Sequence, residues 1–121
     1  MEVPEVAQDW TPIYLAHRKT YAAFLTATDA EARVCWHRWR GDYTDKEWAL
    51  TETDAAYTRT QSEFNMIDLE GLGPIEEARA LITCIRSMHT EDTEPDGVWE
   101  RYTQLRTAFV EAARQHLADH P

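Results

Sequence analysis

The chain of 121 residues is long enough to form one domain with a real hydrophobic core, and its formal net charge is -10 at pH 7. Because nucleic-acid affinity depends on neutralising phosphates with Lys and Arg, this charge argues against direct nucleic-acid binding and favours a basic protein as partner. The sequence contains no basic leader and no run of about 20 apolar residues, so we expect a cytoplasmic protein that does not engage a membrane.

The first predicted helix spans residues 12–40 and follows a lead-in, residues 1–11, that shows no clear periodicity. Thr11 is suited to cap its start, and Gly41 is suited to the position just past its end. Between them, apolar and aromatic residues recur at steps of three and four, which is the period of one helical face. At about 1.5 Å per residue this helix is about 40 Å long, so its wide apolar face needs partner helices along its whole length.

Thr44 and Glu47 match a Thr-x-x-Glu capping box, which predicts that a second helix spans residues 45–67. This helix is less clearly periodic and is rich in Thr, which has a modest helix propensity. We therefore expect tertiary packing to stabilise it. Pro74 suits the first position of a third helix, residues 74–89, whose apolar residues form a compact face.

Asp96 can cap a fourth helix, residues 97–118, after an acidic loop that contains Pro and Gly. Four helices joined by short turns predict an all-α fold, and we expect an antiparallel (up-down-up-down) four-helix bundle that forms a single domain, residues 1–121.

In such a bundle, four of the five tryptophans share one pole together with two arginines of the first helix. The candidate interaction residues are Trp36, Trp39, Arg38, Arg40, Trp48 and Trp99. Two interpretations stay open, because large aromatic residues dominate cores but tryptophan is also enriched at binding hot spots. A Trp39→Ala substitution would destabilise the protein if the pole is a core plug, and would weaken association if the pole is a recognition surface.

The search for catalytic or metal-binding motifs is negative. His116 and His120 are four residues apart on a predicted helix but have no third ligand nearby in sequence, so we interpret them as incidental surface residues. Cys35 and Cys84 lie on apolar faces and are predicted to be buried free thiols. A Cys/His pair would have to come from different helices, for example Cys84 with His17. We therefore predict no catalytic residue, no cofactor and no metal ligand.

The run Tyr21–Leu25, together with the segments Ile67–Leu69 and Gly73–Ala78, resembles small helical proteins that are common in actinobacterial genomes and mostly uncharacterised. This resemblance implies an all-α fold and a cytoplasmic setting, and it carries over no catalytic residue.

Three hypotheses for the function follow, and we favour the first. It is a non-enzymatic protein-interaction or regulatory module, self-associating as a homodimer, in which the Trp-rich pole or the first helix docks a partner. The second is an acidic inhibitor or nucleic-acid mimic that presents the carboxylates of the second helix and of Glu91–Asp96 to a basic groove. The third is a small-ligand-binding bundle with its pocket near His17, Tyr21, Tyr57 and Tyr102.

Overall fold

The structure, a computed structural model, describes residues 11–71 and 73–119, and within these ranges it contains helices and no strand. The helices are α1 Thr11–Trp39, α2 Lys46–Glu70, α3 Ile75–His89 and α4 Val98–Asp119. The predicted all-α class is therefore confirmed for this part of the chain. Of the predicted lead-in, residues 1–11, all but Thr11 lies outside the described residues. No helix in the described ranges has both the length and the apolar character needed to cross a membrane.

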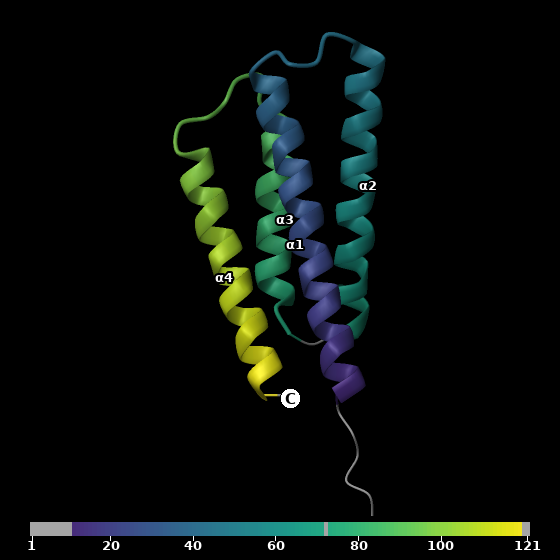
Figure 1. The fold of residues 1–121 in the computed structure, drawn as a ribbon. Helices are drawn as coiled ribbons and strands as arrows, with labels where there is room; N and C mark the ends of the chain where they lie inside the picture. The colour runs from purple at the N-terminus through teal and green to yellow at the C-terminus, as the bar shows by residue number, and fades with distance from the viewer. Residues whose placement is uncertain (1–10, 72, 120–121) are drawn as a thin grey trace, which may run out of the picture.

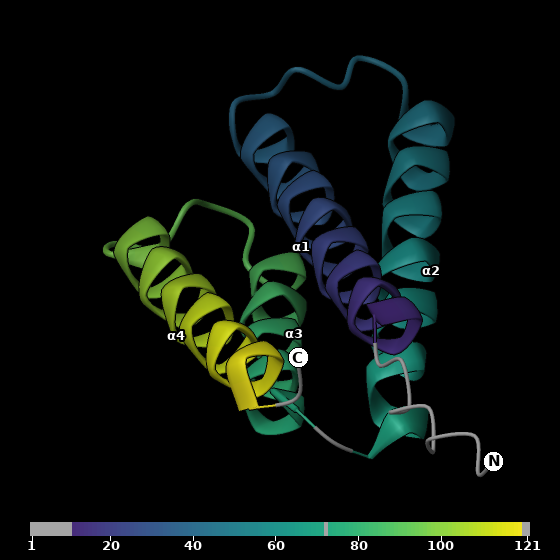
Figure 2. The ribbon, with the colours of Figure 1, turned by 60° about the horizontal axis from the view of Figure 1, so that its bottom comes forward.

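α1 and α3 occupy the centre of the arrangement. Each of them packs against all three other helices, whereas the backbones of α2 and α4 do not approach each other within the described residues. Figure 2 shows α2 and α4 on opposite sides of the central pair. In Figure 1, α1 ends and α4 begins at the upper end of the molecule, while α1 begins and α2 and α4 end at the lower end. These two ends carry the two clusters of side chains described below.

The core forms where α1, α3 and α4 meet. Phe24 of α1 and Phe109 of α4 are fully buried there, with ring centroids 5.0 Å apart. One face of α3 is buried along the whole helix, because its apolar residues recur every three or four positions. The buried residues of this face are Ala78, Leu81, Ile82, Cys84, Ile85 and Met88. Cys35 and Cys84 are buried free thiols, as predicted.

α2 contributes least to the core. Of its 25 residues only Thr60 and Ile67 are buried, and both lie in its second half. The Thr60 hydroxyl donates a hydrogen bond of 3.2 Å to the carbonyl of Ala27 in α1. This weak burial agrees with the poor periodicity of the segment, so α2 depends on its packing against α1.

The ends of the helices differ from the predictions by a few residues. Asp45, not Thr44, caps α2, because its extended backbone lets the carboxylate accept from the amides of Glu47 and Trp48. A carboxylate also interacts more favourably with the helix dipole than a hydroxyl does. α2 runs beyond its expected end to Glu70 and stops at Gly71, whose φ of 72° is left-handed.

Two further helix ends were predicted. Pro74 precedes α3 as its cap residue instead of being its first helical residue. Gly41 is left-handed with φ 72° just past the end of α1, as predicted.

Candidate functional site

The aromatic cluster at the upper end is built by the last turns of α1 and the first turn of α4. Trp39 and Trp99 pack edge to face with ring centroids 6.0 Å apart, and both pack against the core. The Trp39 indole N–H donates to the carbonyl of Glu91 at 2.9 Å, and the Trp99 indole N–H donates to the Glu94 carboxylate at 2.7 Å. Both rings are therefore fixed by the fold.

Trp36 is held differently from these two rings. Its side chain is half-buried and, among the described residues, does not belong to the set that packs against the core. The Arg40 guanidinium instead lies 4.0 Å from its ring centroid, and His37 contacts it edge-on at 5.0 Å. A cation over an indole face is an attractive contact of about 0.5–1 kcal/mol at an exposed site. Trp36 thus presents a large aromatic surface at the solvent boundary.

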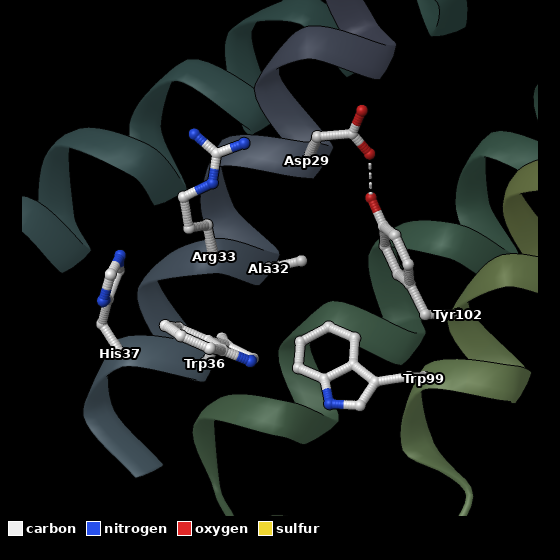
Figure 3. A pocket seen from close by; sticks show the side chains of 7 residues that line it. All are labelled: Asp29, Ala32, Arg33, Trp36, His37, Trp99 and Tyr102. Atoms are coloured by element: carbon white, nitrogen blue, oxygen red, sulfur yellow. Dashed lines mark hydrogen bonds between the residues drawn. The ribbon is translucent and has the colours of Figure 1, made fainter. Parts of the chain in front are cut away.

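A shallow, open pocket of about 470 Å³ lies between α1 and α4 at this end. Figure 3 shows its lining, in which Trp36 of α1 and Trp99 of α4 form one side and Ala32 lies between them and Tyr102. The residues that line it are Asp29, Ala32, Arg33, Trp36, His37, Trp99 and Tyr102. The volume is in the range of small-molecule or side-chain pockets, about 300–1,000 Å³.

The Asp29 carboxylate closes one end of the pocket. Arg106 binds it with two hydrogen bonds of 2.9 Å, and the Tyr102 hydroxyl donates a third. Burial alone would raise the pKa of Asp29, but the hydrogen bonds from Arg106 and Tyr102 outweigh it and lower that pKa. Burial, and then the bond to Asp29, raise the pKa of the Tyr102 hydroxyl. The Asp29 carboxylate is therefore ionised, and the Arg106 guanidinium balances its charge.

Arg33, one helical turn from Asp29 on α1, also lines the pocket and is exposed. Its charge contributes to lowering the pKa of Asp29, but among the described residues its guanidinium makes no hydrogen bond and no ion pair. A guanidinium offers five N–H donors in a planar fork that fits a carboxylate. The pocket therefore combines two indole surfaces with a cation whose donors are available.

The other predicted interaction residues have structural roles or lie apart. Arg38 donates a 2.8 Å hydrogen bond to the carbonyl of Met88, which ties the end of α1 to the end of α3. Arg40 forms an ion pair of 3.2 Å with Glu94 in addition to its stacking on Trp36. Trp48 is half-exposed at 50% and contacts Tyr43 instead of the other tryptophans.

Trp48 lines a separate pocket of about 460 Å³ together with His37 and six other residues. His37 is thus shared by both pockets, and its Nδ1 lies 2.8 Å from the carboxylate of Asp42. The lining of the first pocket has no Cys, Ser or Thr side chain that could act as a nucleophile beside this histidine.

Sequence reasoning did not find two other clusters. Cys35 of α1 pairs with His89 of α3, with its Sγ 3.5 Å from Nδ1, so a Cys/His pair does come from different helices but not from Cys84 and His17. Cys35 is completely buried, so no substrate reaches its thiol. The second cluster lies at the lower end, where His17, Glu70 and His116 meet. His120, which was considered with His116 as a metal pair, lies outside the described residues.

The cluster of His17, Glu70 and His116 at the lower end could have been predicted from the sequence. In an antiparallel bundle with the tryptophans at one pole, the start of the first helix and the ends of the second and fourth helices lie at the other pole. His17, Glu70 and His116 occupy those positions.

Comparisons of the chain with protein-family models, with curated proteins and with solved structures found no match in any of the three. The resemblance to small actinobacterial helical proteins therefore stays an expectation.

Proposed function

We propose that the protein is a non-enzymatic binding module. Its upper pocket receives an apolar or aromatic side chain of a partner protein, and Arg33 binds a carboxylate of the partner next to that side chain. The observation that carries this proposal is the pairing of two half-buried indoles, Trp36 and Trp99, with the available guanidinium of Arg33 around one pocket. Trp and Arg dominate binding hot spots because they bury large areas and still make polar contacts.

The local charge at the pocket differs from the charge of the whole chain. Asp29 is neutralised by Arg106, which leaves Arg33 as the cation that faces a ligand. A bound carboxylate would pair with Arg33 in a partly desolvated setting, where charge-assisted hydrogen bonds are stronger than neutral ones. A basic partner, which the net charge favours, would have to bind elsewhere on the surface.

Three expectations from the sequence belong to this proposal. The helices are taken as an up-down-up-down bundle, which the short connections and the run of the ribbon in Figure 1 support. The protein acts in the cytoplasm. It also forms a homodimer, which the exposed apolar residues of α2 support.

The five tryptophans allow a direct test by nuclear magnetic resonance of their indole N–H groups. Titration with 3-indolepropionate, which joins an aromatic ring to a carboxylate, should shift the signals of Trp36 and Trp99 and leave that of Trp48 unchanged. Tryptamine, which has the same ring and a positive charge, should bind more weakly. Each signal is assigned by a single Trp→Phe variant.

Two variants sharpen the test. Arg33→Gln should remove the preference for the carboxylate probe while the indole of Trp99 still responds, and Trp36→Ala should weaken the binding of both probes. Equal shifts of Trp48 and Trp36, or tighter binding of tryptamine, would contradict the proposed pocket chemistry.

A further inference from the structure

Three helices bring two histidines and a glutamate together at the lower end of the molecule. His17 comes from α1, Glu70 is the last residue of α2, and His116 comes from α4. One ligand atom of each lies within 4.8 Å of the others. The backbones of α2 and α4 do not approach each other within the described residues, so these two helices meet here through the side chains of Glu70 and His116.

The distances in the cluster are unusual for hydrogen bonds. His17 Nε2 lies 3.4 Å from Glu70 Oε2, and His116 Nε2 lies 3.8 Å from Glu70 Oε1. A good N–H···O bond is about 2.7–3.2 Å long, so both distances are too long. Donor atoms about 2.0–2.2 Å from a tetrahedral zinc ion lie about 3.3–3.6 Å from one another. The two nitrogen–oxygen distances are close to this spacing and end on different oxygens of Glu70, and one ligand atom of each residue lies within 4.8 Å of the others.

The surroundings hold the carboxylate in place. The Tyr21 hydroxyl donates a 3.1 Å hydrogen bond to Glu70 Oε1, and Tyr21 itself packs edge-on against the buried ring of Phe109. Such a hydrogen bond to a ligating carboxylate is typical of the residues that orient metal ligands.

The backbone at Gly73 lies directly against the cluster. A Cβ at this position would lie 2.5 Å from the Tyr21 hydroxyl and 3.3 Å from a ring carbon of His116. The φ of Gly73 is +76°, which disfavours other residues as well. The side chains of His17, Glu70 and His116 are 19%, 16% and 9% exposed, so the cluster is largely withdrawn from water.

We propose that His17, Glu70 and His116 bind one divalent transition-metal ion of the zinc type. Two imidazole nitrogens and one carboxylate oxygen suit zinc and its neighbours in the first transition row, whereas magnesium and calcium prefer oxygen ligands alone. Three protein ligands leave a fourth position open for water or a small ligand. A plain ion pair accounts less well for the geometry, because both nitrogen–oxygen distances are longer than those of a hydrogen-bonded pair.

The first experiment titrates the untagged, metal-free chain with Zn²⁺ and follows the imidazole nitrogens by nuclear magnetic resonance. One ion should bind per chain, and the Nε2 signals of His17 and His116 should shift while those of His37 stay unchanged. Co²⁺ in place of Zn²⁺ should give the visible absorption of a four- or five-coordinate site. Binding of less than one ion per chain, or shifts that include His37 equally, would overturn the proposal.

The second experiment compares variants by competition with a zinc-binding dye. His17→Gln, His116→Gln and Glu70→Gln should each lower the affinity for Zn²⁺ at least tenfold. Tyr21→Phe should lower it less, because only the orientation of Glu70 is disturbed. The control is His37→Gln, which removes an exposed histidine that also lies beside a carboxylate, 2.8 Å from Asp42.

The third measurement is the melting temperature with and without Zn²⁺, and it tests the site on the unaltered chain even if some variants fail to fold. Zn²⁺ should raise the melting temperature of the unaltered chain and of His37→Gln, because an ion that binds only the folded state stabilises it. It should not do so in any folded variant that lacks one ligand. If the unaltered chain shows no rise, the metal site is rejected whatever the variants do. This outcome does not bear on ligand binding in the upper pocket, so the metal site can be rejected without rejecting the proposed function.

Discussion

His89 of α3 lies 3.7 Å from the carboxylate of Glu31 in α1, whose side chain is completely buried. Neither oxygen of Glu31 accepts a hydrogen bond from the described residues. The same imidazole also contacts the sulfur of Cys35, one helical turn further along α1. His89 is therefore the nearest cation to a buried charge in the α1–α3 interface, and two predictions follow from this pair.

The first prediction concerns pH. The hydrogen bond to Cys35, and then the Glu31 carboxylate, raise the pKa of His89 to about 9. A histidine with a raised pKa stabilises the folded state fully below its unfolded pKa of about 6.5, and this contribution is lost as the pH rises through about 9. Urea unfolding should therefore show a falling free energy of unfolding between these values. His89→Gln should remove most of this slope, and an unchanged slope in that variant would contradict the assignment.

The second prediction concerns the cost of breaking the pair. His89→Ala leaves the Glu31 carboxylate buried without its cation, and such a change typically costs about 3–5 kcal/mol. A double variant, Glu31→Met with His89→Leu, should be less destabilised than His89→Ala, because well-packed apolar residues can replace a buried ion pair. Denaturant unfolding of His89→Ala measures the cost of the break, and unfolding of the double variant, of Glu31→Met and of His89→Leu measures the coupling. Simple additivity of the single costs would argue against the pair.

The third prediction concerns Gly73. Gly73→Ala places a Cβ in a left-handed backbone conformation and 2.5 Å from the Tyr21 hydroxyl, so it has to displace the bond between Tyr21 and Glu70. Gly41→Ala is the matched control, because Gly41 has φ +72° but no atom within 4 Å of the added carbon. The control should cost about 1–2 kcal/mol from the backbone alone, and Gly73→Ala should cost clearly more. Equal unfolding midpoints for the two variants would show that the clash is relieved cheaply.

The fourth prediction separates two neighbouring tryptophans. Trp39 packs on the core and donates to a backbone carbonyl, so Trp39→Ala should cost about 2 kcal/mol or more of stability. Trp36 rests on Arg40 and His37, so Trp36→Ala should change stability by about 0.5 kcal/mol or less. Thermal unfolding of the two variants measures the difference. A larger loss in Trp36→Ala would mean that Trp36 is a structural residue and a poor candidate for the binding surface.

The fifth prediction is the homodimer. Large apolar side chains of α2 are exposed, with Leu50 at 63% and Leu69 at 84%. We expect sedimentation at twice the chain mass of 14.1 kDa, and we expect Leu50→Lys with Leu69→Lys to shift the protein toward the monomer. Leu15→Lys, at an exposed leucine of α1, is the control. Sedimentation of the unaltered chain as a monomer at high micromolar concentration would refute the dimer.

The sequence predicted the number and order of the helices because their signals are local. Gly41 ends its helix by a backbone preference of its own, and the apolar period of α3 is complete within one segment. The cap of α2 was misassigned because Thr44 and Asp45 are adjacent and both are good caps. Only the backbone conformation decides between them.

The sites were harder to predict because they depend on contacts between helices. Trp36 and Trp39 are equivalent in the sequence, and the difference between them arises from the position of α4 beside α1. The Glu31–His89 pair joins residues 58 positions apart, and neither residue belongs to a recognisable motif. No periodicity of a single helix reveals such a pair.

The uneven burial of α2 has a consequence for how the molecule opens. From Lys46 to Arg59 no residue of this helix is buried, whereas Thr60 and Ile67 anchor its second half. Local opening needs little free energy where few buried contacts are lost. Backbone amides in the first half of α2 should therefore exchange with deuterium through partial fraying, while those of α3 exchange only when the whole domain unfolds.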